Sequence, residues 1–265
     1  MVTAATEMPR ELAVKIERAQ EHAAALLVEN MEQYFGTRPY KIVIEPDDSG
    51  YLGHTAYITF SEPLPPIFAA RTGEALYQLR SVLDHTVMLL SDVPPDSRDT
   101  EFVITNSRES FHGLAGKRRL SDRLDAIRSP EARSFIEAVQ PFNRVSADPD
   151  ASPLWVLHEL FMADKHRRLL LTQAGSHGSR VIPVYPGVKT ISFTTGALRP
   201  DTGGRARLAN LTLTDPRQHV DLDLAPILTI AFADEPVARD KIVFNVLDDI
   251  IRFTAFVVSR LCEHL

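Results

Sequence analysis

Residues 152–173 read SPLWVLHELFMADKHRRLLLTQ, a mostly apolar stretch around which we expect the rest of the chain to be arranged. Ser152 followed by Pro153 predicts the start of a helix, because a serine side chain caps free N–H groups and a proline in the first turn lacks the N–H that would stay unpaired. The apolar spacing that follows predicts a long, partly buried helix. This helix carries one polar cluster, which consists of Asp164, Lys165, His166 and Arg167.

A second long helix is predicted over residues 73–91, from leucines spaced three and four positions apart. Arg80 and Asp84 lie one turn apart at the edge of this leucine stripe, so they can form an ion pair. His85 lies about 140° around the helix from Arg80, at roughly 100° per residue, so one helix alone does not bring these two side chains together. Arg80, Asp84 and His85 form the second polar cluster.

The first helix places a carboxylate on its apolar side. Asp164 falls within one arc with Leu157 and Leu160, where an unpaired carboxylate would be costly. We therefore expect Asp164 to have a partner, and Arg168, one turn on, is the local candidate. Two interpretations stay open: a structural ion pair that locks two helices, or a perturbed group that serves a function.

Length and composition are those of an ordinary globular protein. The chain has 265 residues, of which 44% are hydrophobic and 24% are charged, so it is long enough to bury a full core. The net charge of -6 argues against a strongly basic nucleic-acid-binding surface. The single cysteine, Cys262, excludes an intramolecular disulfide and a cysteine-rich zinc site, and it predicts a reducing, cytoplasmic location.

The sequence also argues against insertion into a membrane. The first residues lack the basic start and the apolar run of a secretory signal. The most apolar helix, near residues 250–258, is interrupted by Arg252, and no apolar stretch reaches the length that a bilayer requires. We expect no membrane partner.

The other segments of the first half are helical, with one hairpin. A helix is predicted over residues 9–35, and two strands joined by a turn predict a β-hairpin over 40–60. A short apolar run at 102–104 reads as a strand, and helical pieces follow over 111–143 with a restart at Ser129. The most basic part of the chain lies here, and acidic neighbours make a solvated helix face the expected structure for Lys117, Arg118, Arg119, Arg123 and Arg128.

The second half is β-rich. Alternation with period two in four segments between residues 191 and 232 predicts an antiparallel sheet. We predict a single domain, 1–265, with a helix-rich core (1–175), a β-rich segment (185–233) and a C-terminal helix (236–263) that packs back on the bundle. The predicted fold class is α+β: a helical bundle with an antiparallel β-sheet from the second half and a small N-terminal β-hairpin.

Several common chemical motifs are missing. There is no Gly-x-Gly-x-x-Gly or Walker-type loop for a nucleotide, and no Gly-x-Ser-x-Gly elbow of a serine hydrolase. The helices carry potential metal ligands, but not at the His-x-x-x-His or Glu-x-x-His spacing that a helical site uses: His158, Glu159, Asp164 and His166. We predict no cofactor and no metal site on one helix, while a site assembled from two helices stays open.

Residues 80–85, Arg-Ser-Val-Leu-Asp-His, fit the pattern Arg-x4-His and in this resemble the HEPN family of helical-bundle ribonucleases. The resemblance implies metal-independent cleavage of RNA in a groove that forms across a homodimer. Arg80 would then stabilise the phosphate, His85 would transfer protons, and Asp84 would orient either of them. The other cluster would add phosphate contacts through Lys165, His166 and Arg167.

The two helices, with the patterns LR..LDH and DKHR, also resemble uncharacterised bacterial proteins, and this likeness implies no mechanism. Two functions besides the ribonuclease stay open. In one, the protein holds a protein partner at a sheet edge or a helix groove, and its polar clusters are structural ion pairs. In the other, it binds an anionic small molecule between the two clusters, with a positive end made of Arg80, Lys165 and His166.

Overall fold

The structure is a computed structural model that describes residues 7–47, 52–92, 100–114, 119–143, 149–166, 172–176, 187–215, 226–233 and 235–265. The chain divides into two compact units. Unit 1 comprises Met1–Ala24, Ala70–Leu170 and Asn245–Leu265, and unit 2 comprises Ala25–Ala69 and Leu171–Phe244. The single domain over 1–265 stays a prediction, because compactness alone does not decide whether the two units fold independently.

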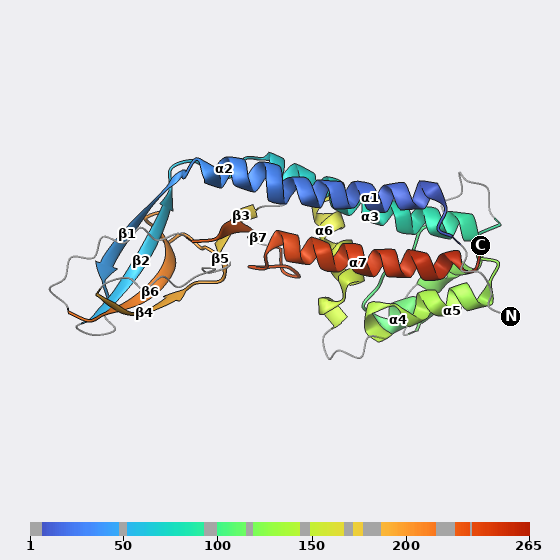
Figure 1. The fold of residues 1–265 in the computed structure, drawn as a ribbon. Coiled ribbons are helices and arrows are strands. Elements are labelled where there is room, and N and C mark those ends of the chain that lie inside the picture. The colour runs from blue at the N-terminus through green and yellow to red at the C-terminus, as the bar shows by residue number, and fades with distance from the viewer. Residues whose placement is uncertain are drawn as a thin grey trace. The chain divides into compact units, whose positions relative to one another are not determined.

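Unit 1 is a helical bundle (Figure 1). It contains all of α6 and most of three further long helices: α1 (Arg10–Ala25), α3 (Ile67–Leu90), α6 (Pro153–His166) and α7 (Val243–Cys262). The predicted leucine spacing is confirmed, since the core-facing side chains are fully buried: Leu76, Leu79 and Leu83 on α3, and Leu157 and Leu160 on α6.

Polar contacts fix how α1 and α3 run past each other. His22 near the end of α1 lies 3.1 Å from Glu74 near the start of α3, from Nδ1 to Oε2. Lys15, earlier in α1, donates from Nζ to Oγ of Ser81, later in α3, at 2.7 Å. The two helices are therefore antiparallel neighbours.

Short helices follow α3, as the sequence predicts for residues 111–143. They are α4 (Arg108–His112), the 3₁₀ helix η2 (Leu120–Leu124), α5 (Pro130–Ala138) and two further 3₁₀ turns, η3 (Pro141–Asn143) and η4 (Pro149–Ala151). The predicted restart is confirmed, because Oγ of Ser129 accepts a hydrogen bond from the N–H of Ala132 at 3.1 Å and so caps α5.

The predicted N-terminal helix is confirmed but is not regular throughout. After α1 the chain forms a π-helical segment, η1 (Leu26–Met31), and then α2 (Glu32–Gly36). None of the helices in the described parts of the chain combines the length and the apolar character that a bilayer span requires.

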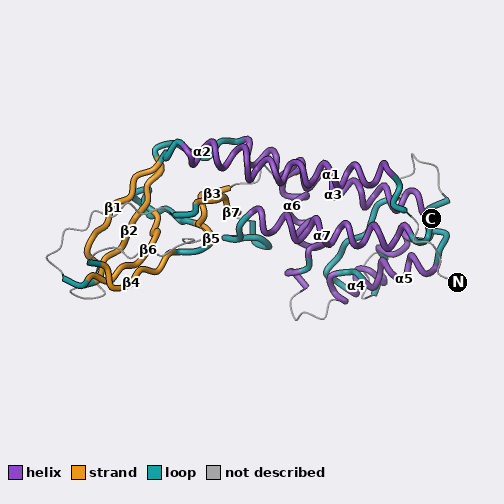
Figure 2. The backbone as a smooth tube through the Cα atoms, in the orientation of Figure 1, coloured by secondary structure: helices purple, strands orange, loops and turns teal. Residues whose placement is uncertain are grey.

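Unit 2 holds every described strand of the chain, drawn in orange in Figure 2. One antiparallel sheet has the order β1-β2-β6-β4, from β1 (Tyr40–Pro46), β2 (Gly53–Phe60), β6 (Ala206–Leu213) and β4 (Val188–Phe193). A second has the order β5-β3-β7, from β5 (Gly196–Ala197), β3 (Thr172–Ser176) and β7 (Leu228–Phe232). The α+β class and the N-terminal hairpin are thus confirmed, with the strands of the second half shared between two sheets.

The hairpin belongs to the larger sheet, because β2 pairs with β6 and places Ala56 opposite Ala209. Residues of both sheets form an apolar core whose central residues are fully buried, among them Ile58 and Leu208. Half-buried aromatic rings such as Phe60 pack against that core. A predicted strand at 220–224 lies outside the described residues.

Some local predictions are wrong. The helix that begins at Pro153 was expected to continue to Gln173, but Thr172 and Gln173 lie in strand β3, and α6 is described over Pro153–His166. The last helix begins at Val243 rather than at 236. The hydroxyl of Ser152 is buried without a hydrogen-bond partner in the described structure, so it does not cap α6 as expected.

Candidate functional site

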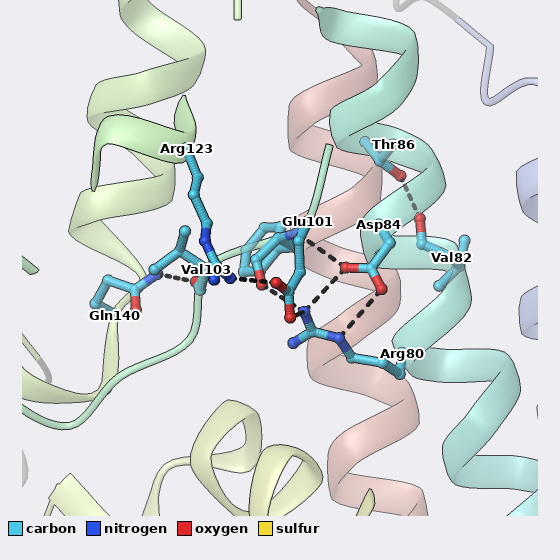
Figure 3. A network of polar contacts seen from close by, with 9 residues as sticks. Arg80, Val82, Asp84, Thr86, Glu101, Val103, Arg123 and Gln140 are labelled. Carbon is cyan, nitrogen blue, oxygen red and sulfur yellow. Dashed lines mark hydrogen bonds and ion pairs between the residues drawn. The ribbon is translucent and has the colours of Figure 1, made fainter. Parts of the chain in front are cut away.

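Arg80 on α3 is almost fully buried and lies at the centre of a polar network (Figure 3). Its Nε donates to Oδ2 of Asp84 at 3.2 Å, and its Nη2 lies 3.0 Å from Oδ1 of the same carboxylate. Nη2 also lies 3.1 Å from Oε1 of Glu101, whose other oxygen pairs with Arg123 of η2. The predicted pair of Arg80 with Asp84 is confirmed, and we call these four residues the Arg80 network.

The Arg80 network bonds the backbone of an extended segment, residues 101–105. The N–H of Phe102 donates to Oδ1 of Asp84 at 2.8 Å, and its carbonyl accepts from Nη2 of Arg80 at 2.8 Å. The side-chain amide of the buried Gln140 donates to the carbonyl of Val103 at 2.8 Å and accepts a hydrogen bond from the N–H of Thr105 at 3.0 Å. Buried backbone groups need partners, and here side chains supply them instead of a neighbouring strand. The strand predicted at the apolar run of this segment is therefore wrong.

The charges of the Arg80 network balance one another. Two guanidinium groups face two carboxylates, so little positive charge is left for a phosphate. Burial raises the pKa of Asp84, the Arg80 guanidinium and the Phe102 N–H lower it, and the Glu101 carboxylate raises it. The net direction is upward, because the effect of burial outweighs that of the guanidinium.

His158 on α6 lies within electrostatic range of the same network. Burial lowers its pKa, the Arg80 charge lowers it further, and Glu101 opposes this shift, so the environment favours the neutral imidazole. Its ring stacks on Trp155, with centroids 5.3 Å apart. Nη1 of Arg80 is buried and has no hydrogen-bond partner in the described structure. The fold thus places His158, a histidine of another helix, within electrostatic range of Arg80.

His85 lies on a different side of α3. Ser81, one turn before His85, accepts a hydrogen bond from Lys15 of α1. Residues four positions apart share one side of a helix, so His85 lies on the side of α3 that faces α1. His85 is half-buried, and its side chain makes no hydrogen bond or ion pair with the described residues. The structure therefore brings Arg80 and Asp84 together and leaves His85 out of their network.

Asp164 packs against the backbone of α3. A Cβ built on Gly73 would lie 2.6 Å from Oδ2 and 2.7 Å from Oδ1 of Asp164, so the carboxylate fills the space that a side chain would need. Oδ1 is buried and has no hydrogen-bond partner among the described residues, and burial raises the pKa of this carboxyl. Its expected partner, Arg168, lies outside the described residues.

The rest of the second cluster contributes little described structure. Lys165 is exposed, and its ammonium lies 5.6 Å from the ring centroid of Phe161, a cation–π contact. The backbone of His166 belongs to α6 but its side chain is not described, and Arg167 lies outside the described residues. No described hydrogen bond or ion pair joins this cluster to the Arg80 network.

A separate pocket of about 450 Å³ lies between α4, η2 and α5. This volume is within the range of small-molecule sites, roughly 300–1,000 Å³. Its apolar lining comes from Phe111, Leu124 and Pro130. Pro130 is the first residue of α5, so the positive end of that helix dipole lies at the pocket.

The charged residues of this pocket fall into two groups. His112 is paired with Glu137, at 3.4 Å from Nε2 to Oε1, and Arg119 is paired with a neighbouring aspartate at 3.2 Å. Arg133 and Asp125 also line the pocket, and neither side chain forms a hydrogen bond or ion pair with the described residues. Arg133 is half-buried and Asp125 is exposed.

Sequence reasoning missed the residues that complete these sites. Glu101 meets Arg80 across 21 positions, and Arg123 meets Glu101 across 22, distances that no helix or strand period links. One signal was present, because Glu101 directly precedes a short apolar run that has to be buried. His158 was considered only as a metal ligand, and within the described structure no three His, Cys, Asp or Glu side chains gather as a metal site would require.

Comparisons with known proteins suggest no function, so a function has to be inferred from the geometry of the sites alone. No protein-family model matches the chain, and no curated protein and no solved structure shows significant similarity to it.

Proposed function

We propose that the protein binds an anionic small molecule, without catalysing a reaction, in the pocket between α4, η2 and α5. The observation that carries this proposal is Arg133, a half-buried residue that lines the pocket and whose side chain has no ion pair with the described residues. A guanidinium presents a planar fork of N–H donors that matches a carboxylate or a phosphate. Such a group in a pocket of this size is suited to hold an anion.

The positive end of this site differs from the one expected between the two polar clusters. Arg80 is bonded to two carboxylates and a carbonyl, so its charge is already compensated. Arg133 has no such partner, and the nearby start of α5 adds a favourable potential for an anion. We assign the Arg80 network a structural role, as a set of ion pairs around one buried guanidinium that fixes the segment after α3.

Thermal unfolding with small anions tests the proposal. We expect inorganic phosphate, propionate or adenosine monophosphate at millimolar concentration to raise the Tm above that in sodium chloride of equal ionic strength, because only binding to the native state stabilises it. Arg133→Gln should remove this increase. Arg18→Gln is the matched control, since Arg18 is an exposed arginine of α1 paired with Glu21, and it should keep the increase.

Two results would contradict the proposal. One is a folded wild-type protein whose Tm none of the anions raises. The other is an increase that Arg133→Gln keeps in full, which would place the anion at another site.

The HEPN-like ribonuclease stays the second proposal, supported by the Arg-x4-His pattern of Arg80 and His85 on one helix, α3. It requires Arg80 to exchange its carboxylate partners for phosphate and a second surface to complete the groove at His85. Cleavage of single-stranded RNA in excess EDTA by the wild type, lost in folded His85→Ala, would establish it and displace the non-catalytic proposal.

A further inference from the structure

The pocket contains an unpaired negative charge as well as an unpaired positive one. Asp125 follows η2 and Arg133 lies on α5, and both line the pocket. They form no hydrogen bond or ion pair with each other or with other described residues, although the charge of Arg133 helps to lower the pKa of the exposed Glu131. Two opposite charges in one pocket thus stay available to a ligand.

We propose that the ligand is a zwitterion of the size of a free amino acid, with its carboxylate on Arg133 and its ammonium group on Asp125. This inference rests on the proposed function, because the anionic group that Arg133 binds in the same pocket is here the carboxylate of the zwitterion. The matching of donors is complete: a carboxylate only accepts hydrogen bonds, an ammonium group only donates them, and the two protein groups have the opposite requirements.

The charge of the pocket favours such a ligand over a simple anion. Its lining includes two arginines and two acidic residues, so the formal charges of these four residues sum to zero. A doubly charged phosphate would meet the carboxylate of Asp125 as a like charge, whereas a zwitterion turns that repulsion into attraction. The apolar atoms of Leu124 and Pro130 leave part of the pocket for the carbon skeleton.

Titration calorimetry with pairs of ligands that differ only in the amino group tests this inference. The pairs are alanine with propionate, and 4-aminobutyrate with butyrate. For at least one pair we expect the wild type to bind the amino compound about tenfold more tightly, the size of effect that one charged hydrogen-bonded contact gives. Asp125→Asn should remove this preference and keep the binding of the simple carboxylate, and Arg133→Gln should abolish both.

A control variant and the possible outcomes distinguish a failure of the zwitterion inference from a failure of the proposed anion binding. Asp248→Asn removes one exposed carboxylate of α7 that pairs with Arg252, and it should keep the preference. Equal affinity of the wild type for both members of each pair, or a preference that survives in Asp125→Asn, would overturn the zwitterion while anion binding stands. Failure of every carboxylate and of phosphate to bind would overturn the proposed function itself.

Discussion

Arg80 is bonded to Asp84, to Glu101 and to the carbonyl of Phe102, and only 4% of its surface is exposed. It has lost nearly all of its hydration, and the carboxylates replace it. Without the guanidinium, two acidic groups would face each other and Phe102 would lose a partner for its buried carbonyl. In the sequence Arg80 suggests phosphate chemistry. In the fold it joins α3 to residues 101–102 through its contacts with Glu101 and with the carbonyl of Phe102.

We predict that Arg80→Met lowers the free energy of unfolding by about 3 kcal/mol, because it leaves the carboxylates of the network without their buried partner. The measurement is urea unfolding followed by circular dichroism. Arg18→Met, which breaks an exposed pair with Glu21, should cost less than about 1 kcal/mol. Equal costs for the two substitutions would show that the Arg80 network contributes no more than a surface ion pair.

At the scale of elements, helices could be predicted where their own spacing decides burial. The leucines of α3 identify it, although its start at Ile67 lies before the predicted residue 73, because the prolines before it, and not the leucine stripe, set that boundary. The strand β3 could not be predicted, since Thr172 and Gln173 directly follow the apolar run of the predicted helix, and their strand depends on pairing with β7. Long-range pairing decides such segments, and no local period reports it.

The close contact of α3 and α6 also could not be predicted from the sequence, because it depends on the absence of a side chain at Gly73. Glycine within a helix usually costs roughly 0.5–1 kcal/mol relative to alanine. Here a Cβ would lie 2.6 Å from the carboxylate of Asp164, well inside van der Waals contact. The glycine is therefore explained by the helix that packs on it rather than by its own helix.

We predict that Gly73→Ala destabilises the wild type but stabilises the Asp164→Ala variant, where the space of the carboxylate is free. Urea unfolding of the two single variants, the double variant and the wild type gives the coupling between the two positions. The sign should change between the backgrounds, with the usual gain of roughly 0.5–1 kcal/mol in Asp164→Ala. The same gain in both backgrounds would mean that Asp164 moves aside at no cost.

At the scale of the molecule, neither unit is built from one continuous stretch. Unit 1 uses three stretches and unit 2 uses two, so the chain passes from one unit to the other after residues 24, 69, 170 and 244. The hairpin looked like a separate addition in the sequence, yet β2 pairs with β6 across the whole of the intervening chain. The boundaries between units therefore could not be predicted from shifts in composition along the sequence.

This division predicts that the two units unfold in one transition. α3 and α7 each continue from one unit into the other without a break, and helix formation is cooperative along the chain. The single tryptophan, Trp155 on α6, reports on unit 1 alone.

Leu208→Ala, in the core of unit 2, should destabilise by about 2–5 kcal/mol, and we expect the urea midpoint of Trp155 fluorescence to fall together with that of circular dichroism. Leu79→Ala in unit 1 is the positive control, since it removes a fully buried leucine of the unit that holds the tryptophan. A fluorescence midpoint that Leu208→Ala leaves unchanged would show that the units unfold independently.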